Sequence, residues 1–199
     1  MGFEVKGMDH SEDIVSLGGK TLSRELLSEL WEERFLKNGS LWGRVYSGSM
    51  RPLIRVNDRV FVERLEPRQL RFGDIVLFKT ENGLVIHRVL GKWRAQGALH
   101  FLQKGDFNPD AECVSAACVL GRVRAVDRDG AVVNFVSGKG YIIQVAMACY
   151  SLAAFGMKQA IGLISGKLPF LRGHGWGKRF DQLGSSILRF LLKVLGLKS

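Results

Sequence analysis

A short polar turn around residue 49 carries the kind of side chain that can attack a peptide carbonyl. Ser47 and Ser49 stand in the segment SGSMRP, residues 47–52, between runs of β-forming residues. A serine hydroxyl is inert at its own pKa, so it needs a general base within hydrogen-bond reach and donors for the oxyanion that forms. The same composition also suits an ordinary Ser/Gly turn. Partners elsewhere in the chain must therefore decide between a nucleophile and a turn.

A titratable imidazole stands inside an otherwise apolar run. His87 lies at the centre of GLVIHRVLG, residues 83–91, which predicts a strand. Histidine titrates near neutral pH, and neighbours on both sides of a strand hold its rotamer, so this position suits proton transfer. The alternative is a histidine at the edge of the core that hydrogen-bonds a backbone carbonyl.

A third segment, QKGDFNPD at residues 103–110, is a turn that carries two acids, Asp106 and Asp110. A carboxylate that hydrogen-bonds the far nitrogen of a catalytic histidine fixes its tautomer and stabilises the imidazolium. Turns also collect Asp and Asn for purely local reasons. By itself, this segment is compatible with either role.

These three segments occur in a fixed order, together with FGDIVLF at residues 72–78. In this order and with these gaps they resemble the signal peptidase I family, which belongs to a wider group that also holds self-cleaving repressors. The resemblance covers residues 43–125. It implies a serine endopeptidase that cleaves signal or leader peptides, with a peptide or preprotein as substrate and with no cofactor or metal.

The resemblance also implies a role for each matched residue. Ser49 matches the family nucleophile, its amide would form part of the oxyanion hole, and Ser47 stands where some members use a further hydroxyl donor. His87 matches the catalytic lysine of the bacterial branch and the histidine of the archaeal and endoplasmic-reticulum branch, so the chain is similar to the Ser/His branch. A lysine base needs its pKa lowered by burial, whereas a histidine base needs little change. Because the loop before the catalytic aspartate is short here, Asp110 is predicted to orient His87, and Asp106 is the alternative.

Charge and cysteine content bound the possible partners. The net charge of +10 attracts phosphate, on nucleic acid or on anionic lipid. Because the C-terminal quarter is both basic and apolar, we expect a membrane rather than nucleic acid. The three cysteines match no C-x-x-C pair and no metal-ligand spacing, which predicts free thiols in a reducing compartment.

The elements that must position these residues are mainly β. A length of 199 residues with 46% apolar content indicates one main domain. The opening residues to about Lys20 are predicted to be a loose tail, and Leu22 to Trp31 have the spacing of an amphipathic helix that Gly39 ends. Seven short runs then predict a small curled antiparallel sheet or partly closed barrel, which is also what the resemblance implies. The runs are 44–46, 59–63, 74–79, 84–90, 99–103, 119–126 and 131–136. The pair Asp129-Gly130 predicts a tight hairpin.

The C-terminal part is predicted to be helical and prone to bind membranes. Residues 141–164 are long and apolar enough to span hydrocarbon, although Lys158 counts against a clean span, so interfacial and sheet-packed positions are the alternatives. Residues 180–197 would form a helix with a wide apolar face edged with cations. We therefore divide the chain into a tail and helix at 1–40, a peptidase domain at 41–138 and hydrophobic, basic segments at 139–199.

The resemblance departs from the family at the anchor. Family members carry a membrane anchor immediately before the catalytic serine, and nothing before Ser47 is apolar enough to be one. We therefore expect a protein that associates with the cytoplasmic membrane through its C-terminal segments; the side of the catalytic domain stays open, and this arrangement favours the cytoplasmic face.

Two alternatives compete with the peptidase hypothesis. A self-cleaving repressor needs an N-terminal DNA reader, and about forty residues with one helix are too few for that. It also needs an Ala-Gly or Cys-Gly bond, and no Ala or Cys precedes Ser49. The other alternative is a catalytically silent module on the same fold that binds membrane surfaces or nucleic acid.

Overall fold

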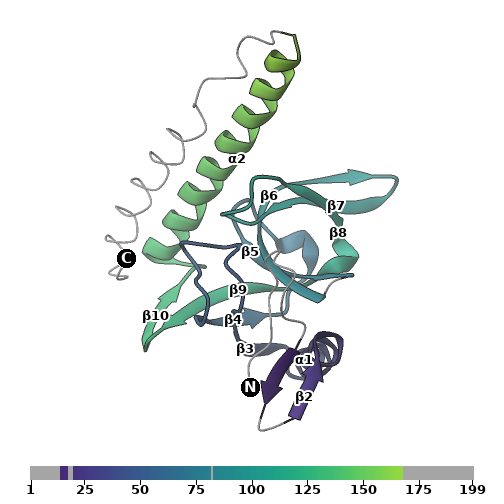
Figure 1. The fold of residues 1–199 in the computed structure, drawn as a ribbon, viewed down its shortest axis with the longest axis vertical. Coiled ribbons are helices and arrows are strands. Elements are labelled where there is room, and N and C mark those ends of the chain that lie inside the picture. The colour runs from purple at the N-terminus through teal and green to yellow at the C-terminus, as the bar shows by residue number, and fades with distance from the viewer. Residues whose placement is uncertain (1–13, 18–19, 82, 168–199) are drawn as a thin grey trace.

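A curled antiparallel sheet dominates the computed structural model, which describes residues 14–17, 20–81 and 83–167. The sheet bends into half a barrel, with helix α1 (Arg24–Asn38) near one end and helix α2 (Gly138–Lys167) along another side (Figure 1). Its strands, in pairing order, are β3 (Ser40–Arg44), β4 (Arg59–Glu63), β9 (Val119–Arg128), β5 (Ile75–Thr80), β6 (Gly83–Ala95), β7 (Ala98–Lys104) and β8 (Glu112–Ser115), and β10 (Ala131–Asn134) pairs with β9. Short 3-10 helices at Pro67–Gln69 and Ala116–Cys118 lie in the connections.

The mainly β prediction is confirmed, and its errors are local. The run 59–63 coincides with β4, whereas the run 44–46 is displaced, because β3 ends at Arg44. Strand β6 extends well beyond the predicted run, past a register shift between Val89 and Gly91. The hairpin prediction holds, since Asp129 and Gly130 have φ of 53° and 85° between the paired strands β9 and β10. Strand β8 was not predicted.

The N-terminal region combines one expected element and one unexpected element. A hairpin of β1 (Ile14–Leu17) and β2 (Lys20–Ser23) occupies part of the stretch predicted to be a loose tail. Helix α1 is confirmed, although it begins at Arg24 and Leu22 belongs to β2 instead. It ends where Gly39 takes a φ of 71° and donates to the carbonyl of Phe35. Trp31 and Phe35 are buried, with ring centroids 4.9 Å apart.

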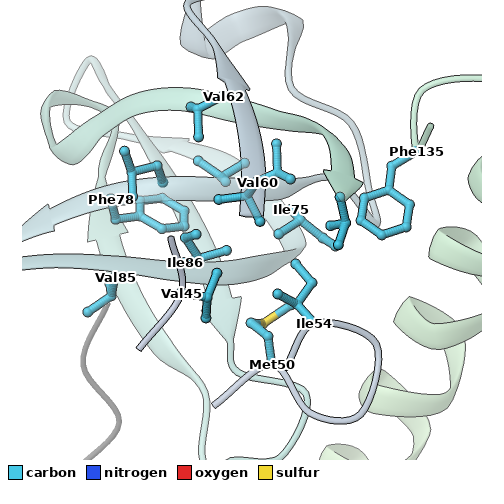
Figure 2. Close-up of a cluster of buried hydrophobic side chains, with 14 of the residues drawn as sticks. Val45, Met50, Ile54, Val60, Val62, Ile75, Phe78, Val85, Ile86 and Phe135 are labelled. Carbon is cyan, nitrogen blue, oxygen red and sulfur yellow. The ribbon is translucent and has the colours of Figure 1, made fainter. Parts of the chain in front are cut away.

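Apolar side chains fill the inside of the curled sheet and also anchor the loop that carries Ser49. Figure 2 shows Met50 and Ile54 among strand side chains such as Ile75 and Val60. Met50 and Ile54 are almost completely buried, and burying a side chain of this size stabilises the fold by about 1.5–3 kcal/mol. The core therefore holds this loop within its turn, at Met50, and after it, at Ile54.

Helix α2 docks one face on the sheet and leaves the other face exposed. Its buried residues recur at the three- and four-residue spacing of one helix face, and they are Ile143, Gln144, Met147, Ala148 and Ser151. On the opposite face Ile142 and Leu152 are exposed. The helix starts beside β10, and its C-terminal half extends beyond the sheet (Figure 1).

Helix α2 is also the membrane-span candidate in the described part of the chain. Over Gly138–Ala160 it is long and apolar enough to cross a bilayer. The expected helix at 141–164 is therefore present, and it packs on the sheet. The predicted amphipathic segment at 180–197 lies outside the described residues.

Candidate active site

A tight turn presents Ser49. The amide of Arg51 donates to the carbonyl of Gly48 at 3.0 Å, which places Ser49 and Met50 at the two central positions. A second bond, from Ile54 to the carbonyl of Met50, continues the loop into the core. Buried Met50 next to the serine fixes the turn, so the Ser49 hydroxyl has a defined place rather than a mobile one.

The two serines of this turn lie together. Their Oγ atoms are 3.5 Å apart, which is a long contact, and Ser49 is only 4% exposed. Among the described residues, no carbonyl or side chain accepts a hydrogen bond from the Ser49 amide. An amide N–H and a neighbouring hydroxyl are the groups that stabilise an oxyanion. The structure thus brings together the two residues predicted for nucleophile and oxyanion support.

The loop after β7 holds the backbone of Ser49. Phe107 donates its amide to the carbonyl of Ser49 at 2.9 Å. A Cβ at Gly105 would lie 2.8 Å from that same carbonyl oxygen, which is closer than real contacts allow. Glycine is therefore required at 105 so that the loop can approach the serine.

His87 lies on β6 and is 6% exposed. Its Nδ1 hydrogen-bonds the Oε1 of Gln103, and the Nε2 of Gln103 donates to the carboxylate of Glu112 at 2.9 Å. The Nε2 of His87 is buried and has no hydrogen-bond partner among the described residues. A buried ring nitrogen without a partner is costly, and a catalytic role is one reason why a protein retains such an atom.

Burial lowers the pKa of His87 below its usual value. The hydrogen bond to Gln103 and the charges of Glu112 and Asp106 oppose this effect, while the charge of Lys104 adds to it. The imidazole is therefore mostly neutral at physiological pH, which is the form that accepts a proton.

The turn after β7 relates Ser49 to His87. Gln103 holds the imidazole, and Phe107, four residues later, donates its amide to the carbonyl of Ser49. No hydrogen bond joins the Ser49 hydroxyl to His87 within the described residues. In catalytic sites such a bond often forms or tightens only when substrate binds.

The two predicted acids have other partners. The buried carboxylate of Asp106 pairs with Arg88, and the exposed carboxylate of Asp110 pairs with Lys158 of α2. Neither aspartate hydrogen-bonds His87. The carboxylate connected to the imidazole belongs to Glu112, through Gln103, and sequence reasoning missed both residues.

One sequence signal could have identified Gln103. It lies two residues after Phe101 on β7, and both side chains are fully buried, so an amide occupies a core-facing strand position. Buried amides are normally hydrogen-bonded, which makes such a position a marker of a polar network.

Lys104 places a second basic group beside the site. Its ammonium donates to the carbonyl of Gly105 at 3.2 Å, and its side chain is nearly inaccessible. Burial lowers the pKa of Lys104, whereas the charge of Asp106 raises it. Lys104 is therefore a partly desolvated cation at the start of the turn that contacts Ser49.

No protein-family model matches the chain, and no curated protein matches it significantly. In the described ranges no three His, Cys, Asp or Glu side chains cluster closely enough to hold a metal ion. The cysteines are free thiols, as predicted. Any function must therefore be argued from the serine, the histidine and their surroundings.

Proposed function

We propose that this protein is a serine endopeptidase of the signal peptidase type that cleaves signal or leader peptides. The observation that carries the proposal is the placement of two groups against one turn, residues 103–107. One is a buried serine whose amide has no acceptor among the described residues, and the other is a buried histidine whose Nε2 has no partner there. A nucleophile, a base and an oxyanion donor are what acyl transfer requires.

The chemistry follows from these roles. When a peptide binds, the Nε2 of His87 takes the proton of Ser49 as the Oγ attacks the carbonyl carbon. The Ser49 amide and the Ser47 hydroxyl stabilise the oxyanion. The imidazolium then protonates the leaving amine, and water hydrolyses the acyl-enzyme with His87 again acting as base. This mechanism requires the Ser49 hydroxyl to reach the Nε2 of His87 when substrate binds.

Phe107 supports an apolar peptide as the substrate. This residue is 74% exposed, although its amide donates to the Ser49 carbonyl. An exposed aromatic ring this near the serine offers a contact for the apolar segment that defines a signal peptide. The substrate would lie extended along a strand edge.

Membrane association is part of the proposal, and the packing of α2 favours a helix that lies along the surface. The residues that dock on the sheet, 143–151, lie inside the apolar stretch Gly138–Ala160 that is long enough to span hydrocarbon. While α2 is docked, lipid cannot surround that stretch, so it cannot cross the bilayer as a whole. Its exposed face and the net charge of +10 suit an anionic surface.

The test is cleavage of a synthetic leader peptide, followed by mass spectrometry. We expect Ser49→Ala to lower the rate by about 10³-fold or more. Ser137→Ala, which changes an exposed serine in the loop before α2, is the matched control and keeps wild-type activity. Equal cleavage by wild type and Ser49→Ala would refute the nucleophile. A wild-type protein that cleaves nothing but binds anionic vesicles would favour the silent membrane module.

A further inference from the structure

Glu112 and Gln103 face each other across neighbouring strands. They are Cα partners in the ladder between β7 and β8, so their side chains lie on the same side of the sheet. Gln103 is fully buried, whereas Glu112 is exposed. The carboxylate therefore keeps its hydration on one side and reaches the buried amide on the other side.

The chemistry of these groups fixes the direction of each hydrogen bond. An ionised carboxylate only accepts, so the Gln103 amide must turn its NH2 group toward Glu112. Its carbonyl oxygen then faces His87 and can only accept. The Nδ1 of His87 must therefore carry the proton, and a neutral imidazole with its proton on Nδ1 has its lone pair on Nε2.

We propose that Glu112 and Gln103 are positioning residues that set the tautomer of His87 so that Nε2 is the basic nitrogen. This inference rests on the proposed role of His87 as general base, and it assigns the orienting function to a carboxylate that acts through an amide. Gln103 cannot accept the imidazole proton, so the proton taken from Ser49 stays on His87 until it passes to the leaving amine.

A relay of this kind differs from a carboxylate in direct contact with histidine. Direct contact would raise the pKa of the imidazole strongly. Here Glu112 is one side chain away, and the other charged groups that act on His87 are Asp106 and Lys104. The relay therefore fixes the tautomer and leaves the imidazole neutral and ready to act at physiological pH.

The test is the nitrogen-15 NMR spectrum of His87 in the full chain at about pH 7.5, above the ordinary histidine pKa. His87→Gln assigns the signal. We expect a protonated Nδ1 and a pyridine-like Nε2 in wild type. Glu112→Gln, in which the new amide can also accept, should give a mixture of both tautomers and lower kcat/KM by about two- to tenfold. Glu33→Gln is the matched control, because it removes the same charge from an exposed position on α1.

A variant that exchanges the two groups separates orientation from charge. In Gln103→Glu with Glu112→Gln, the carboxylate accepts from His87 and the new amide donates to it. We expect the Nδ1–H tautomer to return and the acid limb of the pH profile to move to higher pH. A wild-type Nε2–H tautomer would overturn the inference, and so would an unchanged tautomer in Glu112→Gln. The NMR measurement requires no activity, so an inactive protein with the expected tautomer refutes the peptidase proposal alone.

Discussion

The guanidinium of Arg88 holds the carboxylate of Asp106 in a bidentate ion pair, with contacts of 2.7 and 2.6 Å between two fully buried side chains. The same guanidinium donates to the carbonyls of Gly73 and Gln144. It thereby joins the turn after β7 to the start of β5 and to α2. Because Arg88 follows His87 on β6, one strand carries the proposed base on one face and this anchor on the other.

We expect Asp106→Asn to destabilise the protein by about 3–5 kcal/mol, because it leaves a buried guanidinium without its counter-charge. Urea unfolding measures this change. The matched control is Asp110→Asn, whose carboxylate is 68% exposed in its ion pair with Lys158. Exposed pairs contribute about 0–1 kcal/mol, so the control should be close to wild type. Similar losses in both variants would contradict the anchoring role of Arg88.

Gly105→Ala should damage both stability and activity. The added methyl group would lie 2.8 Å from the carbonyl oxygen of Ser49, so the turn or the serine must move. We expect a loss of about 1–3 kcal/mol from this overpacking. We also expect kcat/KM for leader-peptide cleavage to fall because the nucleophile is displaced.

Gly156→Ala is the control for that substitution. Position 156 lies in α2, and a Cβ there would meet no atom within 4 Å. Alanine in a helix interior is favoured over glycine by about 0.5–1 kcal/mol, so this variant should be slightly more stable and fully active. A Gly105→Ala protein with normal stability and activity would show that the turn does not constrain Ser49.

The sequence predicted those parts of the fold that local patterns determine. Alternating apolar residues located β4, and the Asp129-Gly130 pair located a hairpin. The sequence did not predict strand β8, because this strand has only four residues and lies at the edge of the sheet, where it needs no alternation of apolar residues. Missing β8 also meant missing Glu112, since only the β7–β8 register places it opposite Gln103.

The acids illustrate the limit of motif reasoning. A turn sequence shows where carboxylates are, but which charge each one faces depends on packing between strands. Arg88 was read as part of an apolar run, yet it is buried and binds Asp106. Asp110 lies near α2 and binds Lys158. Contacts between residues 18 and 48 positions apart cannot be deduced from the local spacing of either aspartate.

His87 should make stability depend on pH in the mildly acidic range. Its pKa is lowered in the folded state by burial, so between that lowered value and about 6.5 the unfolded chain binds more protons. The stability that His87 contributes is fully present above about pH 6.5, and it is lost as the pH falls through the pKa of the folded state. We expect the free energy of unfolding to decrease from pH 7.5 to pH 5.5 by more in wild type than in His87→Gln. These two pH values lie about one unit above and below the ordinary histidine pKa.

The comparison with His87→Gln removes the effects of other groups. Burial raises the pKa of Glu63, but the hydrogen bonds and charges of Arg122 and Arg124 together outweigh it and leave this pKa below its usual value. Burial raises the pKa of Asp74, so the two shifts change stability in opposite directions at more acidic pH. Both contributions are present in both proteins, so the difference reports His87. Equal pH slopes would mean that the folded and unfolded states bind the imidazole proton equally.

The exposed face of α2 should be the part of the described chain that meets the membrane. Cys149 is exposed, seven residues after Ile142 and three before Leu152, so these side chains share the face opposite the docked one. A polarity-sensitive fluorophore on Cys149, with the other cysteines changed to serine, should shift to the blue when phosphatidylglycerol vesicles are added. Salt should weaken the shift, because the protein carries a net charge of +10.

The matched control places the same fluorophore on Cys113, an exposed residue of β8. It reports binding that brings the sheet edge rather than α2 to the lipid, and we expect no shift there. Co-sedimentation with the vesicles confirms that both labelled proteins bind. If the protein sediments but the Cys149 probe does not respond, α2 does not face the bilayer. If the Cys149 probe is already shielded without vesicles, this face is covered by protein, and the surface orientation proposed for α2 is wrong.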